Sequence, residues 1–563
     1  MRRTPRGPGS SAARRVCRLV ESHVPATVSP PGALHDALDH ADVEWDASVF
    51  ATLFATASLA LGLVVCLAVV GTGGTTRNGL VAAVVVGGGT YLVAAYGLPR
   101  LVLTRRRARQ FGALPGFVCR VSLGMRLTPT LERGVDAGFT TDDALTALVP
   151  RRPGADARSM LDTALGDLGP TGPRTNGLLQ AATTATNPDV LLDRAVETTM
   201  DGVRTRMRTY ASTLRGPVTA IYAFGVVLPL ALVGVLPAAP LAGYNLSLVA
   251  LAFVFDCVLP VGIVAGTCWL IARRPIVDPP PRLPATHPEL GTRSATIASG
   301  VLGSSIGVAL GHLLQPWAPW ILGPAWGFGA ALLVRFQPAL PEIDRLRTTR
   351  DAVPDLLALL GDSMADGAPP ERALTEAGRL PGTAGIVASD AEHVRHRLGI
   401  PVPTAIGGDH GPLADLDKRY TGPVTALVEA AGNAGRPGGD ALSRYADHLD
   451  DLAELEASVR ADLAAITDTL GQTAAFYAPA IGGVTVALAT RLRDTSETLA
   501  TTGDGFALVV GSYVLVLAVV LPVLAETLQS GWCRVRIGAS IGRTLVVAGG
   551  CFPLVAQFAS HLL

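Results

Sequence analysis

The sequence predicts an all-α, polytopic membrane protein with about nine transmembrane helices and two duplicated helical-bundle domains in the cytoplasm. Composition is the first reason: the 563 residues are 49% hydrophobic and only 16% charged, whereas about a quarter of the residues of soluble domains are charged. Long apolar runs alternate with two long polar segments, which is the second reason. The third is that the second half of the chain repeats features of the first half.

The apolar runs set the number of spans, because a helix needs about 17 to 25 apolar residues to cross the hydrocarbon layer. Such runs are found at 48-70, 80-99, 217-239, 246-271, 295-314, 318-334, 471-490, 505-527 and 537-560. The polar segments between them, 100-215 and 335-469, are too long and too rich in charge to be connecting loops. Neither contains sustained period-two runs of β-branched residues, so each is predicted to be a helical domain.

These features divide the chain into a series of parts. They are a cytoplasmic N-terminal tail (1-47), a transmembrane hairpin (48-99), a first cytoplasmic helical domain (100-215), a second hairpin (216-272), a proline-rich cytoplasmic linker (273-294), a third hairpin (295-334), a second cytoplasmic helical domain (335-469) and three C-terminal transmembrane helices (470-563). The first apolar run begins too far into the chain for a cleavable signal peptide, so the tail is expected to stay attached.

Arginines at the ends of the spans predict the orientation, because cytoplasmic loops carry an excess of positive charge. Arg100 and Arg105 follow the second span, Arg273 follows the fourth, and Arg534 follows the eighth. With a cytoplasmic N-terminus, both polar segments and the proline-rich linker lie inside the cell. The C-terminus then lies outside.

An internal repeat relates the two polar segments. The matched residues are Pro115 with Pro354, Met125 with Met364, Glu132 with Glu371, and Arg133 with Arg372, each pair 239 positions apart. A shared register in unrelated segments is improbable by chance, so the repeat indicates duplication.

Each polar segment also ends in an amphipathic helix that runs into a predicted span. In the second segment the apolar stripe consists of Leu442, Tyr445, Leu449, Leu452, Val459, Leu463, Ile466 and Leu470, and in the first segment of Leu192, Val196, Val203, Met207, Tyr210 and Leu214. These spacings of three, four or seven residues place each stripe on one helix face.

The sequence contains no assembled catalytic, cofactor or metal site. Lys418, the only lysine, lies outside any glycine-rich phosphate-binding loop, so we expect neither intrinsic ATP hydrolysis nor another enzymatic activity. His393 and His396 have a spacing that helical metal sites tolerate, but no third ligand is near, which favours a solvated helix face. Asp256 lies at membrane depth, where the alternatives are a proton or cation site and a carboxylic acid hydrogen-bonded within the bundle.

Charge is balanced overall but divided between the segments. The 46 basic and 46 acidic residues give no general preference for nucleic acid. Segment 100-215 has 17 basic and 11 acidic residues, a net charge of +6, whereas segment 335-469 has 13 basic and 22 acidic residues, a net charge of −9. The two domains could therefore dock on each other or on a charged partner. The alternative is a solvated acidic surface, with arginines near anionic membrane lipid.

Certain motifs resemble those of the type II secretion system F family, in particular its longer archaeal members from archaellum and type IV pilus assembly. The motifs are Ala-Val-Pro-Asp-Leu-Leu at 352–357, Glu-Arg-Ala-Leu at 371–374, Val-Glu-Ala-Ala-Gly-Asn-Ala-Gly at 428–435 and Gly-Gly-Asp-Ala-Leu at 438–442. The first half departs from this pattern, because Gln180 stands where the second half has Glu429.

The resemblance implies a non-enzymatic membrane platform without a cofactor, which contacts a hexameric secretion ATPase and assembles pilin-like subunits. We expect the acidic second domain to bind the ATPase. The candidate partner-binding residues are Glu371, Arg372, Glu429, Asp450, Asp451 and Glu454. A secondary transporter or permease built from repeats is the alternative function. The sequence leaves open whether the chain forms a homodimer.

Overall fold

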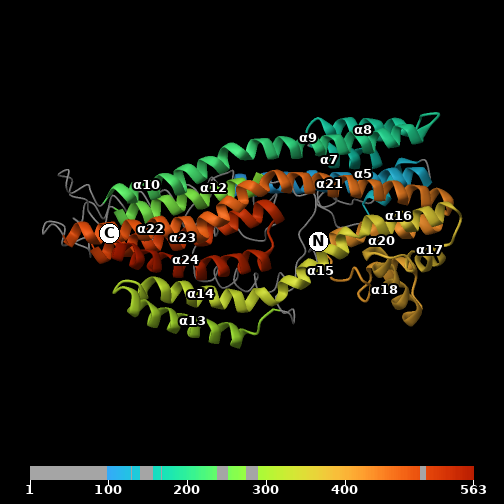
Figure 1. Ribbon diagram of the computed structural model, residues 1–563. Helices are drawn as coiled ribbons and strands as arrows, with labels where there is room; N and C mark the ends of the chain where they lie inside the picture. The colour runs from blue at the N-terminus through green and yellow to red at the C-terminus, as the bar shows by residue number, and fades with distance from the viewer. Residues whose placement is uncertain are drawn as a thin grey trace, which may run out of the picture.

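The computed structural model describes residues 98–127, 130–139, 156–166, 168–236, 251–273, 290–416, 418–494 and 503–562. Within these ranges the regular structure is entirely helical, with no strand, which confirms the all-α class. The helices form an elongated molecule (Figure 1). The predicted membrane helices gather at one end, here called the apolar end, and the helices of segments 100-215 and 335-469 form the other, here called the polar bundle.

The first half contains α5 (Leu98–Leu127), α6 (Leu131–Gly138), α7 (Ala157–Leu165), α8 (Thr171–Ala182), α9 (Pro188–Tyr222), the π-helical turn η3 (Ala223–Val227), α10 (Leu228–Val235), a second π-helical turn η5 (Phe253–Val258) and α12 (Leu259–Arg273). The repeat matches Pro115 with Pro354, which lies in the first turn of α16, but α5 begins at Leu98 and continues through Pro115. Leu114 and Phe117 beside it are fully buried. Their packing outweighs the one backbone hydrogen bond that proline removes.

The second half contains α13 (Arg293–Leu314), α14 (Pro319–Phe336), the 3₁₀ turn η6 (Gln337–Ala339), α15 (Leu340–Asp351), α16 (Val353–Ala365), α17 (Pro370–Ala377), α18 (Thr383–Leu398), α19 (Val402–Gly407), α20 (Lys418–Ala434), α21 (Arg436–Gln472), the π-helical turn η7 (Thr473–Tyr477), α22 (Ala478–Asp494), α23 (Gly503–Ser530) and α24 (Arg534–Leu562). Local signals explain several boundaries. Thr292 caps α13 by accepting a hydrogen bond from the Ala295 amide at 3.3 Å. Gly399 ends α18 with a φ of 64°, which favours glycine.

Among the described helices, six are long and apolar enough to cross a membrane. They are Pro188–Val235, Phe253–Ile271, Arg293–Leu314, Arg436–Arg491, Asp504–Gln529 and Arg534–Leu562, and each overlaps a predicted span. Helix α14 covers nearly all of the predicted span 318-334 but is not one of the six. The predicted spans 48-70 and 80-99 lie almost entirely outside the described residues. The total of nine therefore stays a prediction.

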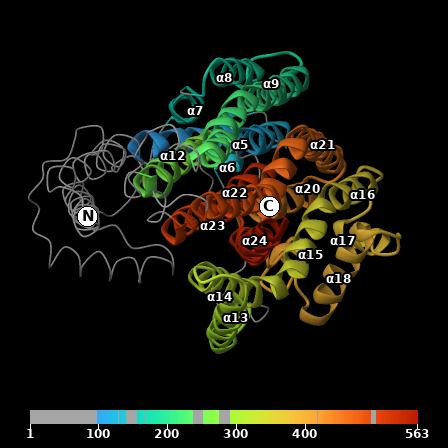
Figure 2. The same ribbon diagram turned by 60° about the vertical axis from the view of Figure 1, so that its left-hand side comes forward.

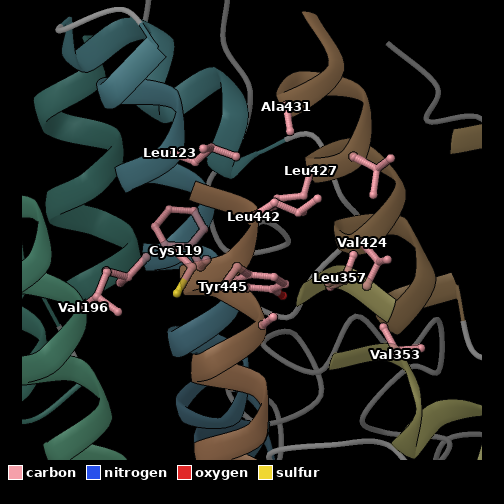
Figure 3. Close-up of a cluster of buried hydrophobic side chains, with 14 of the residues drawn as sticks. Cys119, Leu123, Val196, Val353, Leu357, Val424, Leu427, Ala431, Leu442 and Tyr445 are labelled. Atoms are coloured by element: carbon pink, nitrogen blue, oxygen red, sulfur yellow. The ribbon is translucent and has the colours of Figure 1, made fainter. Parts of the chain in front are cut away.

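The polar bundle has one continuous core. Buried apolar residues between 111 and 207 and between 346 and 455 belong to the same cluster. Leu442 and Tyr445 of α21 lie between Cys119 and Leu123 of α5 on one side and Leu427 of α20 on the other (Figure 3). Segments 100-215 and 335-469, which the sequence predicts as two domains, are thus packed together across α21.

A second core fills the apolar end, with α23 at its centre. Tyr513, Leu517 and Leu521 of α23 have no exposed surface. At the edge, α13 packs on α14, as both views of the ribbon show (Figures 1 and 2). An added Cβ on Gly307 would lie 2.5 Å from the Leu322 carbonyl oxygen, so glycine is what lets these two helices approach closely.

Two long helices join the cores. Helix α9 continues through η3 into α10, and α21 continues through η7 into α22. All eight residues of the predicted α21 stripe are buried or partly buried, and the stripe passes from the polar core at Leu442 to the apolar core at Leu470. The α9 stripe does the same between Leu192 and Leu214. Both amphipathic helices are thus continuous with stretches that are long and apolar enough to cross a membrane, as the sequence predicts.

Candidate partner-binding surface

The six predicted partner-binding residues lie in two separate places. Glu371 and Arg372 occupy the first turn of α17, and Glu429 lies near the end of α20. These two ends meet, because the Pro370 ring would lie 3.2 Å from a Cβ added to Gly432. Asp450, Asp451 and Glu454 lie instead on the side of α21. Asp450 is about 21 Å along α21 from Arg436, the first residue of this helix, at 1.5 Å per residue.

The first place, here called the tip, consists of Glu371, Arg372 and Glu429. All three side chains are exposed. Arg372 donates a hydrogen bond to Glu376 one turn later at 2.8 Å, and Ser363 donates another at 3.1 Å. The Arg372 hydrogen bond, followed by that of Ser363, lowers the pKa of Glu376. Arg372 is therefore already engaged within α17, while the carboxylates of Glu371 and Glu429 face solvent.

Asp451 is part of the contact between α9 and α21. Arg204 of α9 lies 2.8 Å from Asp451, and the two side chains keep 36% and 43% of their surface exposed. A second ion pair crosses the same contact in the opposite sense, between Arg444 of α21 and Asp193 of α9 at 3.4 Å. The opposite net charges of the two segments thus serve, at these pairs, to dock the segments on each other.

An acidic patch remains on the outer side of α21. Partial burial, followed by repulsion from Asp355, Asp447 and Asp451, raises the pKa of Asp450. We define the acidic patch as Asp355 of α16 with Asp447, Asp450 and Glu454 of α21, all of which are exposed. Binding of a cationic surface would relieve this repulsion. Asp447 could have been found from its helical spacing to Asp450 and Glu454, but Asp355 lies too far away in the sequence.

A polar cleft of 690 Å³ adjoins the patch on the α9 side. It is lined by Arg204, Arg208, Ser212, Asp451, Glu454, Leu455, Ser458, Val459 and Asp462. Its arginines come from α9 and its carboxylates from α21, so the cleft presents both charges. Glu454 belongs to both the cleft and the patch, which makes it the member best placed to reach a partner in either.

His393 and His396, whose spacing helical metal sites tolerate, both contact residues of their own helix, α18. His396 lies 2.9 Å from Glu392, and His393 Nδ1 lies 3.2 Å from the Ser389 carbonyl oxygen. Hydrogen bonds from Arg395 first, and from Thr375, lower the pKa of Glu392 to about 2. Across the described parts of the chain, no group of three or more histidine, cysteine or acidic residues is arranged to hold a metal ion.

Comparison of the chain with protein-family models, with curated proteins and with solved structures gives no significant match.

Proposed function

We propose that the chain is an integral membrane platform for assembly of a type IV pilus-like or archaellum filament. In this proposal a hexameric secretion ATPase binds the polar bundle in the cytoplasm, and pilin-like subunits are handled at the apolar end. The observation that carries it is the pair of long helices, α9 and α21, whose apolar stripes pass from one core into the other. A helix packed at both ends can transmit a displacement along its length, because packed interiors deform little.

The motif resemblance and the order of helices also support the proposal. Each half has a group of shorter helices, then a long helix, then a π-helical turn at the start of the apolar end. Duplication of one unit would give this order. It would also give each half one long connecting helix, α9 or α21. Force applied to the polar bundle would then reach both halves of the apolar end.

The acidic patch is the proposed ATPase-binding surface, and it provides the test of the function. The double substitution of Asp450→Arg with Glu454→Arg should weaken capture of the partner ATPase by about tenfold at low ionic strength, because it replaces two attractive charges by repulsive ones. The difference should shrink towards 1 M salt, where the screening length is about 3 Å. Binding is measured by pull-down with the full chain in detergent or nanodiscs.

Two further variants make this result specific. Asp390→Arg on α18 changes an exposed acid away from the patch and should leave binding unchanged. The double substitution of Glu371→Arg with Glu429→Arg tests whether the tip contributes to binding of the ATPase. Asp451 is left intact because its ion pair with Arg204 belongs to the fold. Equal binding by the wild type and the patch variant at every salt concentration would show that the patch is only solvated surface.

The proposal also requires the polar bundle to face the cytoplasm. A single cysteine at Ser458, placed in a variant without the native cysteines, should resist a membrane-impermeant maleimide in intact cells and react after permeabilisation. A cysteine at Ser496, in a predicted outer loop, should react in both. Labelling of position 458 from outside would rule out the platform.

A further inference from the structure

A polar contact joins the two halves inside the apolar end. Ser512 of α23 has its hydroxyl oxygen 2.8 Å from Oδ1 of Asp256 in η5. The next residue, Tyr513, donates a hydrogen bond to the Gly225 carbonyl of η3 and packs edge-on against Phe255 with ring centroids 5.4 Å apart. Two π-helical turns of the first half therefore meet one helix of the second half at adjacent residues.

This contact lies well inside the membrane region. Ser512 is about 12 Å along α23 from Asp504, where the apolar stretch begins, at 1.5 Å per residue. From the other end, Asp256 is about 22 Å from Ile271, the last residue of its own apolar stretch. Both values place the carboxyl group inside a hydrocarbon layer of about 30 Å. An unpaired carboxylate is costly at such a depth.

Among the residues that the structure describes, the neighbours of Asp256 offer it no counter-ion. The elements that pack on η5 are α12 and α23, and the side chain of α23 that contacts Asp256 is Ser512. Within the described residues no arginine, lysine or histidine forms an ion pair with Asp256 or acts on it electrostatically. Phe255 and Tyr513 cover one side of the contact, with Tyr513 fully buried. The surroundings thus favour a neutral group.

Counting protons relates the direction of the hydrogen bond to the protonation state of Asp256. The Ser512 hydroxyl oxygen lies 2.8 Å from Asp256 Oδ1 and 2.9 Å from the Val509 carbonyl oxygen. A hydroxyl has one proton and can donate to only one of them. With an ionised Asp256 one of the two contacts lacks a proton, whereas a protonated carboxyl group donates to Ser512 and leaves the Ser512 proton for the Val509 carbonyl. A carboxyl group donates only when it is protonated.

We propose that Asp256 is a proton-binding site at the contact between the two halves, and that its neutral carboxylic acid donates a hydrogen bond to Ser512. Release of the proton leaves a carboxylate. The Ser512 hydroxyl must then turn from Val509 to Asp256, and an uncompensated negative charge remains in the membrane. Proton release therefore weakens the contact between η5 and α23, which ties the packing of the two halves to proton occupancy. The site does not depend on the proposed platform function.

The first test is infrared spectroscopy of the full chain in nanodiscs at neutral pH. The difference spectrum between the wild type and Asp256→Asn should contain a carbonyl stretching band of a protonated carboxylic acid. Ser512→Ala should shift this band, because the acid loses its hydrogen-bond acceptor. Carboxylate bands in place of the acid band would overturn the proposal, as would an acid band that Ser512→Ala does not move.

Thermal unfolding provides a second, independent test. Asn is neutral and its amide can donate to Ser512, so Asp256→Asn should unfold at nearly the wild-type temperature at neutral pH. Asp256→Ala should unfold at a lower temperature. Ser305→Ala on α13 is the control for Ser512→Ala, since Ser305 also donates to a carbonyl in its own helix, at 2.9 Å, but from an exposed position. A large change in Asp256→Asn, matching that of Asp256→Ala, would show that the native group is ionised.

Discussion

Ala457→Pro is expected to abolish filament assembly while the protein still inserts into the membrane. Ala457 is exposed in the interior of α21, so the substitution disturbs no core side chain. Proline removes the hydrogen bond to the Ala453 carbonyl and its ring clashes with that carbonyl, at a cost of about 3 kcal/mol or more. The break falls between the polar core and the apolar core, where the proposed function requires α21 to be continuous. Electron microscopy of cells measures filaments, and immunoblotting of membranes measures insertion.

The matched control is Ala457→Ser, which changes the same exposed position without removing an amide. It should assemble filaments as the wild type does. Wild-type filament numbers in the proline variant would mean that α21 is not the element that transmits force, even if the patch on its side binds the ATPase.

Local patterns in the sequence were enough to predict the helical class and the long helices. The stripe from Leu442 to Leu470 has a spacing that only a helix can bury on one face. The structure has this helix continuing from the stripe into a stretch that is long and apolar enough to cross a membrane. Such signals lie within one helix, so neighbouring residues are sufficient to read them.

Contacts between distant residues were not predictable in the same way. Asp451 was predicted to bind a partner, and its spacing to Asp450 and Glu454 gives no sign that Arg204 pairs with it. The charge difference between the segments indicated docking in general but not which residues meet. Asp256 was recognised only because it lies inside a predicted membrane span. Its partner Ser512 lies on α23, in the other half of the chain. The sequence therefore located candidate groups, and the fold decided which of them are engaged.

Gly439→Ala is expected to destabilise the polar bundle by about 1–3 kcal/mol, the usual cost of overpacking a close contact. An added Cβ on Gly439 of α21 would lie 2.3 Å from the Ala365 amide nitrogen and 2.7 Å from the Gly361 carbonyl oxygen, both of them backbone atoms of α16. Backbone cannot move aside as a flexible side chain can, so the two helices must separate. Thermal unfolding of the purified chain, followed by circular dichroism, measures the effect.

The same helix provides the control for this glycine. Gly471 lies in α21 with nothing within 4 Å of an added Cβ, so Gly471→Ala meets no neighbour. It should stabilise the chain by about 0.5–1 kcal/mol, because alanine restricts the unfolded backbone more than glycine does. The two substitutions are chemically identical, so opposite shifts would assign the loss to the α16–α21 contact. Shifts of the same sign and size would mean that α16 and α21 do not approach as closely as Gly361 and Gly439 allow.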